Sequence, residues 1–385
     1  MNSHRQLRYF CFLSLFSSVF LLSSCREEVV VYAVEQEPCG EPKQNGIAGF
    51  YLLNEGNMGS NKSTIDYYDY TTGIYNRNIY SAHNPTVTKE LGDVGNDLRV
   101  YGNRLYAVVN VSNKVEVMDA RTLRRIGQVD IPNCRNICFN GAYAYVTSYA
   151  GPVVINPDYE QKGYIARFDT ATLQIQDRCI VGFQPDGIEV ADGKKLYVAN
   201  SGGYMVPNYE NTLSVIDLAT FTEIKRIPVA VNLQYAKLDQ YGQLWVNNRG
   251  NYYDIPSKLY CIDTHTDQLL DSINMAVSNF TIVGDSLYFY GSEWSYILME
   301  EKVSYGIVDV RSRQLLTDRF ITDGTESRIE KPYGIAVNSK TYEILLTDAK
   351  DYVTPGMLYC FSPSGTCLWS VRTGDIPAHF AFLVR

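Results

Sequence analysis

Aromatic, amide and charged side chains recur in the segments that follow strand-like runs of this chain. Residues 54–61 read Asn-Glu-Gly-Asn-Met-Gly-Ser-Asn, residues 202–211 contain two tyrosines and two asparagines, and residues 249–254 read Arg-Gly-Asn-Tyr-Tyr-Asp. Aromatic rings can stack on the face of a flat ligand while amides bond to its edges. Tyrosines also make rigid contacts in protein interfaces. These segments therefore predict a binding surface for a bulky polar ligand.

The candidate ligand-binding residues lie in these loops or at the start of the strand-like run that opens each repeat. They are Asn54, Glu55, Asn57, Asp97, Arg135, Tyr149, Gln184, Tyr204, Tyr209, Arg249, Tyr252, Tyr253, Trp294, Tyr296, Asp351, Tyr352 and His379. Asn232, Asn279 and Tyr333 occupy the same kind of position.

Residue patterns for catalysis are sparse. His83 lies in a loop without a recognisable partner, His265 sits in an ordinary strand turn, and His379 is the histidine placed to reach a central ligand. The sequence shows no glycine-rich phosphate loop, nucleophile elbow or histidine metal pair. Oxygen ligands for calcium could come from loop carboxylates, although solvated carboxylates explain the same residues: Asp323, Glu326, Asp348 and Asp351. We therefore expect a protein that is not an enzyme, with no catalytic residues, no bound metal and no catalytic cofactor.

A repeat determines where these residues lie. Seven strand-like runs end in short turns, with a return every 46 to 53 residues. The turns begin at Asp69, Asp119, Asp169, Asp217, Asp263, Asp309 and Ser362. A fixed period of this length is typical of repeat architectures. The unit at residues 187–228 contains four segments rich in Val, Ile, Tyr and Thr, the residues that strands prefer. Four-stranded sheets repeated radially form a β-propeller.

The two ends of the chain complement each other. The first unit contains three strand segments, at residues 50–53, 64–68 and 75–79, and one spare segment follows the last unit at residues 378–383. The sequence therefore predicts an all-β, seven-bladed β-propeller of four-stranded blades over residues 46–385, closed by a C-terminal strand that completes the first blade. In such a ring the loops that hold the candidate residues share one face.

The N-terminal segment has the features of an export signal. Residues 1–24 combine a basic start with an apolar run, residues 9–22, that is too short to span a bilayer. The ending Leu22-Ser-Ser-Cys25 resembles a bacterial lipobox, in which Cys25 is lipidated. An ordinary signal peptide is the alternative. Residues 25–45, with Pro38, Gly40 and Pro42, are then expected to form a lipidated flexible tether.

Net charge and cysteine content bear on the class of ligand and on the state of the thiols. A net charge of −8 argues against binding nucleic acid, which requires clustered Lys and Arg. Seven cysteines follow Cys25, and their scatter among apolar runs indicates buried small side chains. A disulfide between Cys360 and Cys367, which flank one hairpin, is an alternative for that pair.

Three resemblances to known families and signals narrow the expected function. The repeat Leu196-Tyr-Val-Ala-Asn200 with Val215-Ile-Asp-Leu-Ala-Thr220 resembles the YVTN and YncE-like propellers. Residues 26–28, Arg-Glu-Glu, resemble the surface-export signal of outer-membrane lipoproteins in gut-dwelling Gram-negative anaerobes. Together with residues 53–59, 90–97, 200–204 and 374–380, these features resemble the BtuG-type surface lipoproteins.

The BtuG-type resemblance implies an outer-membrane, lipid-anchored protein that faces the cell exterior. It would bind cobalamin or another corrinoid as a transported ligand and pass it to a TonB-dependent outer-membrane transporter. Coordination of cobalt by His379 is conceivable, and packing of that side chain is the alternative. A glycan-binding or protein-interaction propeller of another uptake system remains a second hypothesis. A lyase or lactonase on the same fold is a third.

Overall fold

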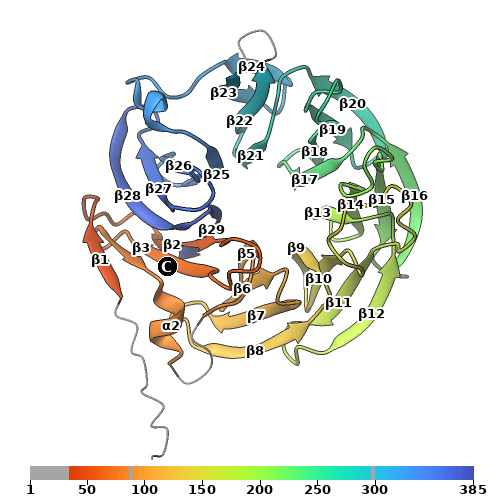
Figure 1. Cartoon of the computed structure of the whole chain (residues 1–385), viewed down its shortest axis with the longest axis horizontal. Helices are drawn as coiled ribbons and strands as arrows, with labels where there is room; N and C mark the ends of the chain where they lie inside the picture. The colour runs from red at the N-terminus through yellow and green to blue at the C-terminus, as the bar shows by residue number, and fades with distance from the viewer. Residues whose placement is uncertain (1–33, 86–89, 296–299) are drawn as a thin grey trace, which may run out of the picture. The chain divides into compact units, whose positions relative to one another are not determined.

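The protein forms a ring of seven antiparallel sheets (Figure 1), as predicted. The structure is a computed structural model that describes residues 34–85, 90–295 and 300–385. The predicted lipidation site Cys25, the signal peptide and residues 26–28 lie outside the described residues. None of the helices in the described ranges is long and apolar enough to cross a membrane.

Each sheet is one blade, and the chain runs through the blades in order. Blade 1 contains β1 (Glu35–Pro38), β2 (Ile47–Asn54), β3 (Thr64–Asp69), β4 (Ile74–Arg77) and β29 (Pro377–Val384). Blade 2 contains β5 (Gly95–Tyr101), β6 (Arg104–Val109), β7 (Lys114–Asp119) and β8 (Arg125–Asp130). Blade 3 contains β9 (Cys134–Asn140), β10 (Tyr143–Ser148), β11 (Tyr164–Asp169) and β12 (Ile175–Ile180). Blade 4 contains β13 (Pro185–Ala191), β14 (Lys195–Asn200), β15 (Thr212–Asp217) and β16 (Thr222–Pro228).

The second half of the ring continues the pattern. Blade 5 contains β17 (Leu233–Leu238), β18 (Gln243–Asn248), β19 (Leu259–Asp263) and β20 (Gln268–Ile273). Blade 6 contains β21 (Asn279–Val283), β22 (Ser286–Ser295), β23 (Glu300–Asp309) and β24 (Gln314–Thr317). Blade 7 contains β25 (Pro332–Val337), β26 (Ile344–Asp348), β27 (Pro355–Phe361) and β28 (Cys367–Asp375). Two short helices, α2 (Ile79–His83) and η2 (Thr325–Arg328), lie in connections between blades.

The ring closes through the last strand, as the sequence predicts. Strand β29 is the innermost strand of blade 1 and pairs antiparallel with β2, from Ile47 opposite Val384 to Asn54 opposite Pro377. The C-terminus accordingly lies within the first blade, beside the red strands in Figure 1. The first and last strands of the described residues therefore share one sheet.

Blade 1 differs from the expectation at its outer edge. Residues 35–38 were expected within a flexible tether, but they form β1 and pair antiparallel with β4. Ile79 was expected at the end of a strand, yet β4 ends at Arg77 and Ile79 begins helix α2. Blade 1 thus has five strands, because the edge of β4 is paired with a segment that precedes the repeats.

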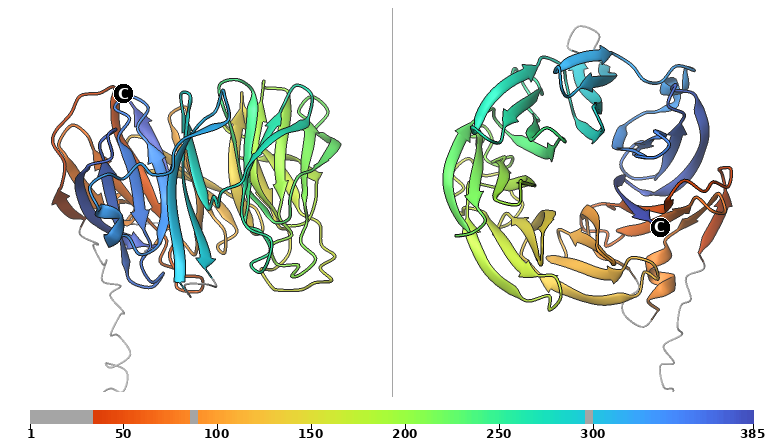
Figure 2. Two further views of the ribbon diagram at one scale, coloured as in Figure 1. Left: turned by 90° about the horizontal axis from the view of Figure 1, so that it is seen from above. Right: turned by 180° about the vertical axis from the view of Figure 1, so that it is seen from behind.

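Figure 2 shows the blades standing side by side around the ring. Apolar side chains fill the spaces between neighbouring blades. Tyr106 and Val108 of β6 pack with Ile137 of β9 and Val146 of β10 in one such cluster. Trp245 is fully buried, and its indole Nε1 donates to Asp239 Oδ2 at 2.9 Å. Burial on both faces makes each blade depend on its neighbours, which fixes the radial positions of the strand ends.

The face that carries the turns between third and fourth strands is regular. In blade 2, the Asp119 carboxylate accepts hydrogen bonds from the backbone N–H of Arg121 and Thr122 and from the Thr122 hydroxyl. Asp169 and Asp309 bind the equivalent groups of blades 3 and 6. Hydrogen bonds of this kind stabilise the charged form, and those from Thr122 lower the pKa of the Asp119 carboxyl below its usual value.

Candidate binding site at the mouth of the ring

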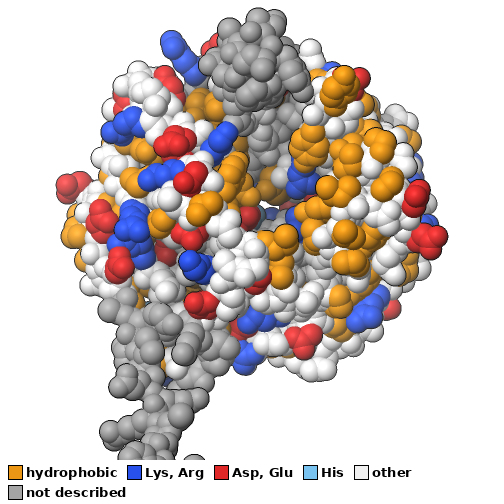
Figure 3. Space-filling model, viewed as in Figure 1, with side chains coloured by type: hydrophobic (Ala, Val, Ile, Leu, Met, Phe, Trp, Pro, Cys, Tyr) orange, Lys and Arg blue, Asp and Glu red, His pale blue; other side chains and the backbone are white. Residues whose placement is uncertain are grey.

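Two adjoining cavities open on the face that carries the loops between second and third strands. Their volumes are about 320 Å³ and 480 Å³, and both are lined by Gln234, Tyr235, Arg249 and Tyr333. A third cavity of about 290 Å³ lies in the central channel and also contacts Tyr235. We call the first two cavities the mouth and the third the channel cavity. Figure 3 shows hydrophobic side chains bordering the central hollow, with charged side chains visible within it.

Irregular backbone at the start of the innermost strands aims side chains into the mouth. The register shifts between Gly95 and Asp97 in β5, between Pro185 and Ile188 in β13, and between Leu233 and Ala236 in β17. Similar shifts occur in β9, β25 and β29. A bulge bends its strand and redirects a side chain, and bulges are common beside binding sites.

Polar residues of the second strands support these irregular segments. Asn247 Oδ1 accepts the backbone N–H of Tyr235 at 2.9 Å. Thr147 Oγ1 accepts the N–H of Asn136 at 3.0 Å and donates to the carbonyl of Asp186 at 2.9 Å. These bonds satisfy backbone groups that the interrupted ladder leaves unpaired.

Three consecutive blades contribute to a cluster that we call the arginine clamp: Arg135, Asp186 and Arg249. Arg135 Nε lies 3.0 Å from Asp186 Oδ1, and Arg249 Nη1 lies 2.9 Å from Asp186 Oδ2. The Tyr149 hydroxyl donates to the same carboxylate at 2.9 Å. Burial alone would raise the pKa of the Asp186 carboxyl, but the two arginines outweigh it and lower that pKa. Asp186 is therefore a carboxylate held between two cations.

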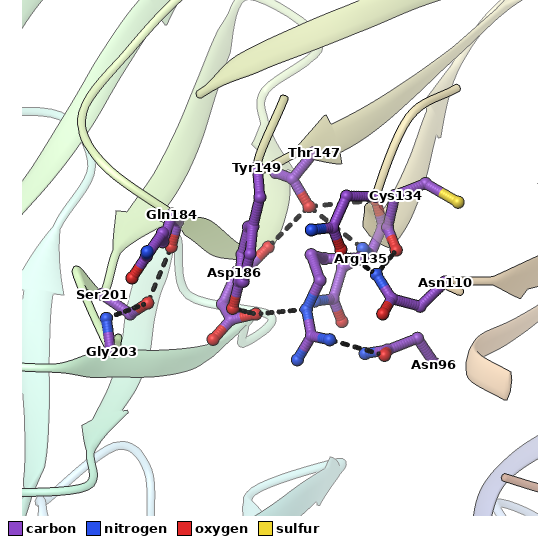
Figure 4. Close-up of polar contacts among 12 residues, drawn as sticks. Asn96, Asn110, Cys134, Arg135, Thr147, Tyr149, Gln184, Asp186, Ser201 and Gly203 are labelled. Atoms are coloured by element: carbon purple, nitrogen blue, oxygen red, sulfur yellow. Dashed lines mark hydrogen bonds and ion pairs between the residues drawn. The ribbon is translucent and has the colours of Figure 1, made fainter. Parts of the chain in front are cut away.

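The position of Arg135 is fixed from two further directions (Figure 4). Its Nη1 donates to Asn96 Oδ1 at 2.8 Å, and its guanidinium carbon lies 4.8 Å from the centre of the Tyr149 ring. Such cation–π contacts orient a guanidinium as well as attract it. The Tyr149 ring also contacts Tyr204 edge-on, with centroids 6.3 Å apart.

An acidic group lies elsewhere in the same mouth. Glu55 Oε1 is 3.0 Å from His379 Nε2, and Glu55 Oε2 accepts the Tyr333 hydroxyl at 2.9 Å. Burial, followed by the charge of Glu55, raises the pKa of Tyr333 well above its usual value, so the phenol stays protonated and donates. The Tyr333 ring contacts Tyr352 edge-on at 5.9 Å. The mouth thus contains fixed positive and fixed negative groups with tyrosine rings around them.

The channel cavity contains a second group of charges. Arg99 Nε lies 3.2 Å from Asp97 Oδ1, and Lys237 Nζ donates to the Phe280 carbonyl at 2.6 Å. Burial, followed by the charge of Arg99, lowers the pKa of Lys237 to about 8, and Asp97 and Glu189 oppose the shift. Burial raises the pKa of the Glu189 carboxyl, although Arg99 acts against it. The channel below the mouth is therefore polar.

The structure brings many of the predicted residues together. Those that line the mouth are Glu55, Asn57, Arg135, Tyr204, Arg249, Tyr252 and Tyr352. Asp97 and His379 line the channel cavity. Tyr252 has 67% of its surface exposed and Tyr352 has 41%, so both rings are available to a ligand.

Other predicted residues support the site from behind. Gln184 is fully buried, and its Oε1 accepts the backbone N–H of Tyr204. Asn54 is also buried, and it donates to the Thr64 hydroxyl. Tyr149 holds Arg135 and Asp186. A ligand in the mouth would meet the groups that these three side chains position.

Tyr209, Tyr253 and Asp351 are not among the residues that line the three cavities. The Tyr209 hydroxyl donates to the Asn251 carbonyl at 3.4 Å, and Tyr253 is 80% exposed. Asp351 accepts the N–H groups of Val353 and Thr354 within its own turn, and these bonds lower the pKa of its carboxyl to about 2. Trp294 belongs to β22. Tyr296 lies outside the described residues.

The candidate list did not include Asp186, Tyr235 and Asn96. Each lies one to three residues from a position that the sequence did select, namely Gln184, Asn232 and Asp97. The register shifts explain the displacement, because an extra residue changes which side chain points to the ring axis. A polar residue directly before or within the first positions of an innermost strand is the signal that could have found them.

Metal and thiol chemistry receive no support from the described part of the chain. Within residues 34–85, 90–295 and 300–385, His, Cys, Asp and Glu do not gather in threes as metal ligands. Cys360 and Cys367 are free thiols, and so are the five other described cysteines, of which four are buried. The disulfide alternative for the pair is therefore not realised, and the expectation of buried small side chains is confirmed for Cys134, Cys138, Cys179, Cys261 and Cys360.

Fold and site together define a seven-bladed β-propeller with a polar, tyrosine-lined mouth. The chain belongs to the family described as Domain of unknown function (DUF5074), whose model matches residues 48–366. No curated protein matches the chain.

Solved structures resemble the chain in fold. A putative 6-phosphogluconolactonase from Bacteroides fragilis is 11% identical with a TM-score of 0.60, over 89% of this chain and 100% of that one. The periplasmic gluconolactonase of Pseudomonas aeruginosa is 13% identical with a TM-score of 0.58, over 87% and 99%. A quinonprotein alcohol dehydrogenase-like protein from Bacteroides thetaiotaomicron is 15% identical with a TM-score of 0.56, over 88% and 79%. At these identities the likeness concerns the propeller fold alone.

Proposed function

We propose that this protein is a cell-surface lipoprotein that binds cobalamin or a related corrinoid in the mouth of the ring. It would pass the ligand to a TonB-dependent outer-membrane transporter and would not transform it. The YncE-like and BtuG-type resemblances of the repeat, together with the lipobox at Cys25, motivate this proposal.

One observation carries the proposal: two adjoining cavities with shared walls combine exposed tyrosine rings with fixed polar groups. A corrin ring is broad and rimmed by amides, so it needs apolar faces and hydrogen-bonding partners over a wide area. Tyr252 and Tyr352 offer exposed rings, while Asn57, Gln234 and Glu55 offer donors and acceptors. Sites with this mixture hold a ligand by shape and by a few placed polar groups.

The two carboxylates of the mouth, Glu55 and Asp186, are already engaged by neighbouring groups, which favours binding over catalysis. Glu55 is engaged by His379 and Tyr333, and Asp186 is engaged by two arginines and Tyr149. A general base needs a lone pair directed at its substrate. The carboxylates of Glu55 and Asp186 are instead directed at neighbouring side chains of the protein.

Titration of the purified soluble domain, residues 34–385, with cyanocobalamin tests the proposal. Calorimetry should give saturable binding with one site per chain at micromolar protein or below. Absence of heat and of any change in the visible spectrum would contradict it. Binding of oligosaccharides in a parallel titration, without a response to cobalamin, would instead favour the glycan-binding hypothesis.

A pair of tyrosine substitutions locates the site. The double variant Tyr204→Ala, Tyr252→Ala should weaken binding by about tenfold or more, since each stacked ring contributes about 1 kcal/mol. Its melting temperature should change little, because Tyr252 is largely exposed. Tyr241→Ala, which removes an exposed ring from the opposite face, is the control. A large loss of stability in the double variant would make these tyrosines structural.

The lipid anchor is tested separately in cells. Cys25→Ser should release the protein from the membrane fraction, and accessibility to added protease should show that the wild-type protein faces outward. Continued membrane attachment of Cys25→Ser would contradict the lipidated anchor without bearing on the ligand.

A further inference from the structure

The arginine clamp has more positive charge than its own carboxylate neutralises. Two guanidinium cations, Arg135 and Arg249, share the single carboxylate of Asp186, so the cluster has a net charge of +1. Both arginines line the 320 Å³ cavity of the mouth. An ion pair that served only to stabilise the fold would need one cation for one carboxylate.

Hydrogen-bond donors of both arginines remain available. Among the described residues, Arg135 uses Nε for Asp186 and Nη1 for Asn96, and Arg249 uses Nη1 for Asp186. A guanidinium has five N–H donors in a planar fork, so Nη2 of Arg135 and both Nη2 and Nε of Arg249 retain donors. Arg249 is also the more accessible of the two, with 25% of its side chain exposed against 14% for Arg135.

The clamp is preorganised. Asn96 and the Tyr149 ring hold the Arg135 plane, and Asp186 is 3% exposed and accepts from Tyr149 as well as from the arginines (Figure 4). Guanidinium forks whose planes are fixed lose little rotamer freedom when they bind an anion. Charge-assisted bonds from two such forks match the oxygens of a phosphate or a carboxylate.

The opposite sign lies in another part of the mouth. Glu55 lines the same 320 Å³ cavity and is held by Tyr333 and His379. A ligand with an anionic group therefore has one favourable orientation, with that group at the arginines and its neutral N–H or O–H donors toward Glu55. Charge complementarity of this kind fixes the orientation of the bound ligand as well as contributing to its affinity.

We propose that Arg135 and Arg249, held by Asp186, form an anion subsite that binds a phosphate ester or carboxylate of the ligand. This inference rests on the proposed function where the ligand is a corrinoid, in which case the phosphodiester of the nucleotide loop is the anionic group. The amide side chains of the corrin ring then face Glu55 and the tyrosines.

A cycle of one protein variant and one ligand change tests the subsite. Cobinamide phosphate and cobinamide differ by the phosphate ester, so their affinity ratio for wild-type protein measures what the phosphate contributes. Arg249→Gln should weaken binding of cobinamide phosphate by about tenfold or more and leave that of cobinamide within about twofold. Arg249→Lys, which keeps the charge and loses the fork, should fall between the two.

Controls separate the subsite from general charge effects and from folding. Arg124→Gln removes the same charge from an exposed turn on the opposite face and should leave the affinity ratio unchanged. Arg249→Gln leaves Asp186 paired with Arg135 and Tyr149, so its far-ultraviolet spectrum and unfolding midpoint should stay close to wild type. Equal weakening of both corrinoids by Arg249→Gln would overturn the subsite.

A second probe keeps the test independent of the corrinoid. If neither corrinoid binds wild-type protein, the proposed function fails, and inorganic pyrophosphate then decides the subsite. Saturable binding of pyrophosphate to wild type that is lost in Arg249→Gln and kept in Arg124→Gln would retain it. Absence of pyrophosphate binding in that case would overturn it.

Discussion

The two faces of the ring use carboxylates in opposite ways. On the face of the turns between third and fourth strands, the aspartates that begin the turns bind groups within their own turn, as Asp119 does with Thr122. On the mouth face, Asp186 binds arginines of two other blades, and Glu55 binds residues 278 and 324 positions away. The first arrangement recurs from blade to blade, whereas Asp186 and Glu55 each join residues of different blades.

This difference concerns what each arrangement of charges contributes to the stability of the fold. Burial of Asp186 and its arginines removes three charges from water, and charge burial of that kind adds little net stability compared with apolar packing. The turns on the opposite face close their hairpins with exposed carboxylates, such as that of Asp119, which stay in contact with water. The mouth-face charges are therefore the ones whose arrangement is costly for the fold, and the proposed binding function would account for them.

The largest expected effect comes from breaking the clamp. Asp186→Asn should lower the free energy of unfolding by about 3 kcal/mol, because it leaves two largely buried arginines without their counter-charge. Urea denaturation measures this loss. Asp177→Asn, which removes an exposed partner of Arg167, should cost less than about 1 kcal/mol. Equal losses in the two variants would show that the clamp is no more structural than a surface pair.

A smaller, pH-dependent effect is expected in the channel. The pKa of Lys237 is about 8 in the folded chain and about 10.4 in an unfolded one. Between these values the unfolded chain binds more protons, so stability should rise with pH by about 1–3 kcal/mol. Below pH 8 both states are protonated and the full penalty is present.

Urea denaturation between pH 7.5 and 10.5 measures that rise against Lys237→Met. The variant should lack this part of the slope, while Lys225→Met, which removes a more exposed lysine, should keep it. A slope that is unchanged in Lys237→Met would mean that the amine is fully charged in the folded channel.

The smallest expected effect is a change in the pKa of an aspartate in a turn on the opposite face. Thr122→Val removes the hydroxyl that donates to Asp119 and should raise the pKa of that carboxyl toward its ordinary value. A lowered pKa stabilises the fold above the unfolded value, and this contribution disappears as the pH falls through the folded value. Carboxyl shifts in an NMR titration report the change. The pKa of Asp217, in blade 4, should stay the same.

Much of the fold could be predicted because its signals are local. The Asp-x-x-Thr turns and the alternation of Val, Ile and Tyr in the strands recur at a fixed period, and the spare segment at residues 378–383 indicates closure. Strand β1 could not be predicted in the same way, because residues 35–38 lack strand-forming side chains and pair only where β4 leaves an edge. These residues also precede the first repeat, so the repeat pattern does not predict a strand there.

The candidate site could be predicted in outline. Chain position placed Glu55, Arg135, Tyr204, Arg249 and Tyr252 on the mouth face, because a ring of blades alternates its loops between two ends. It could not separate Gln184, a buried support, from Asp186, a clamp residue two positions later. That choice depends on the bulge between Pro185 and Ile188, which the residue types do not encode.

The sequence by itself determined the number of blades, their closure and the face that carries the aromatic loops, since each follows from short-range turns and a repeat. Only the tertiary structure decided that Arg135 and Arg249, separated from Asp186 by 51 and 63 residues, meet on one carboxylate. The physical reason is that such ion pairs need the strand ends of separate blades at fixed distances from the ring axis. Packing between blades and the local bulges set those distances.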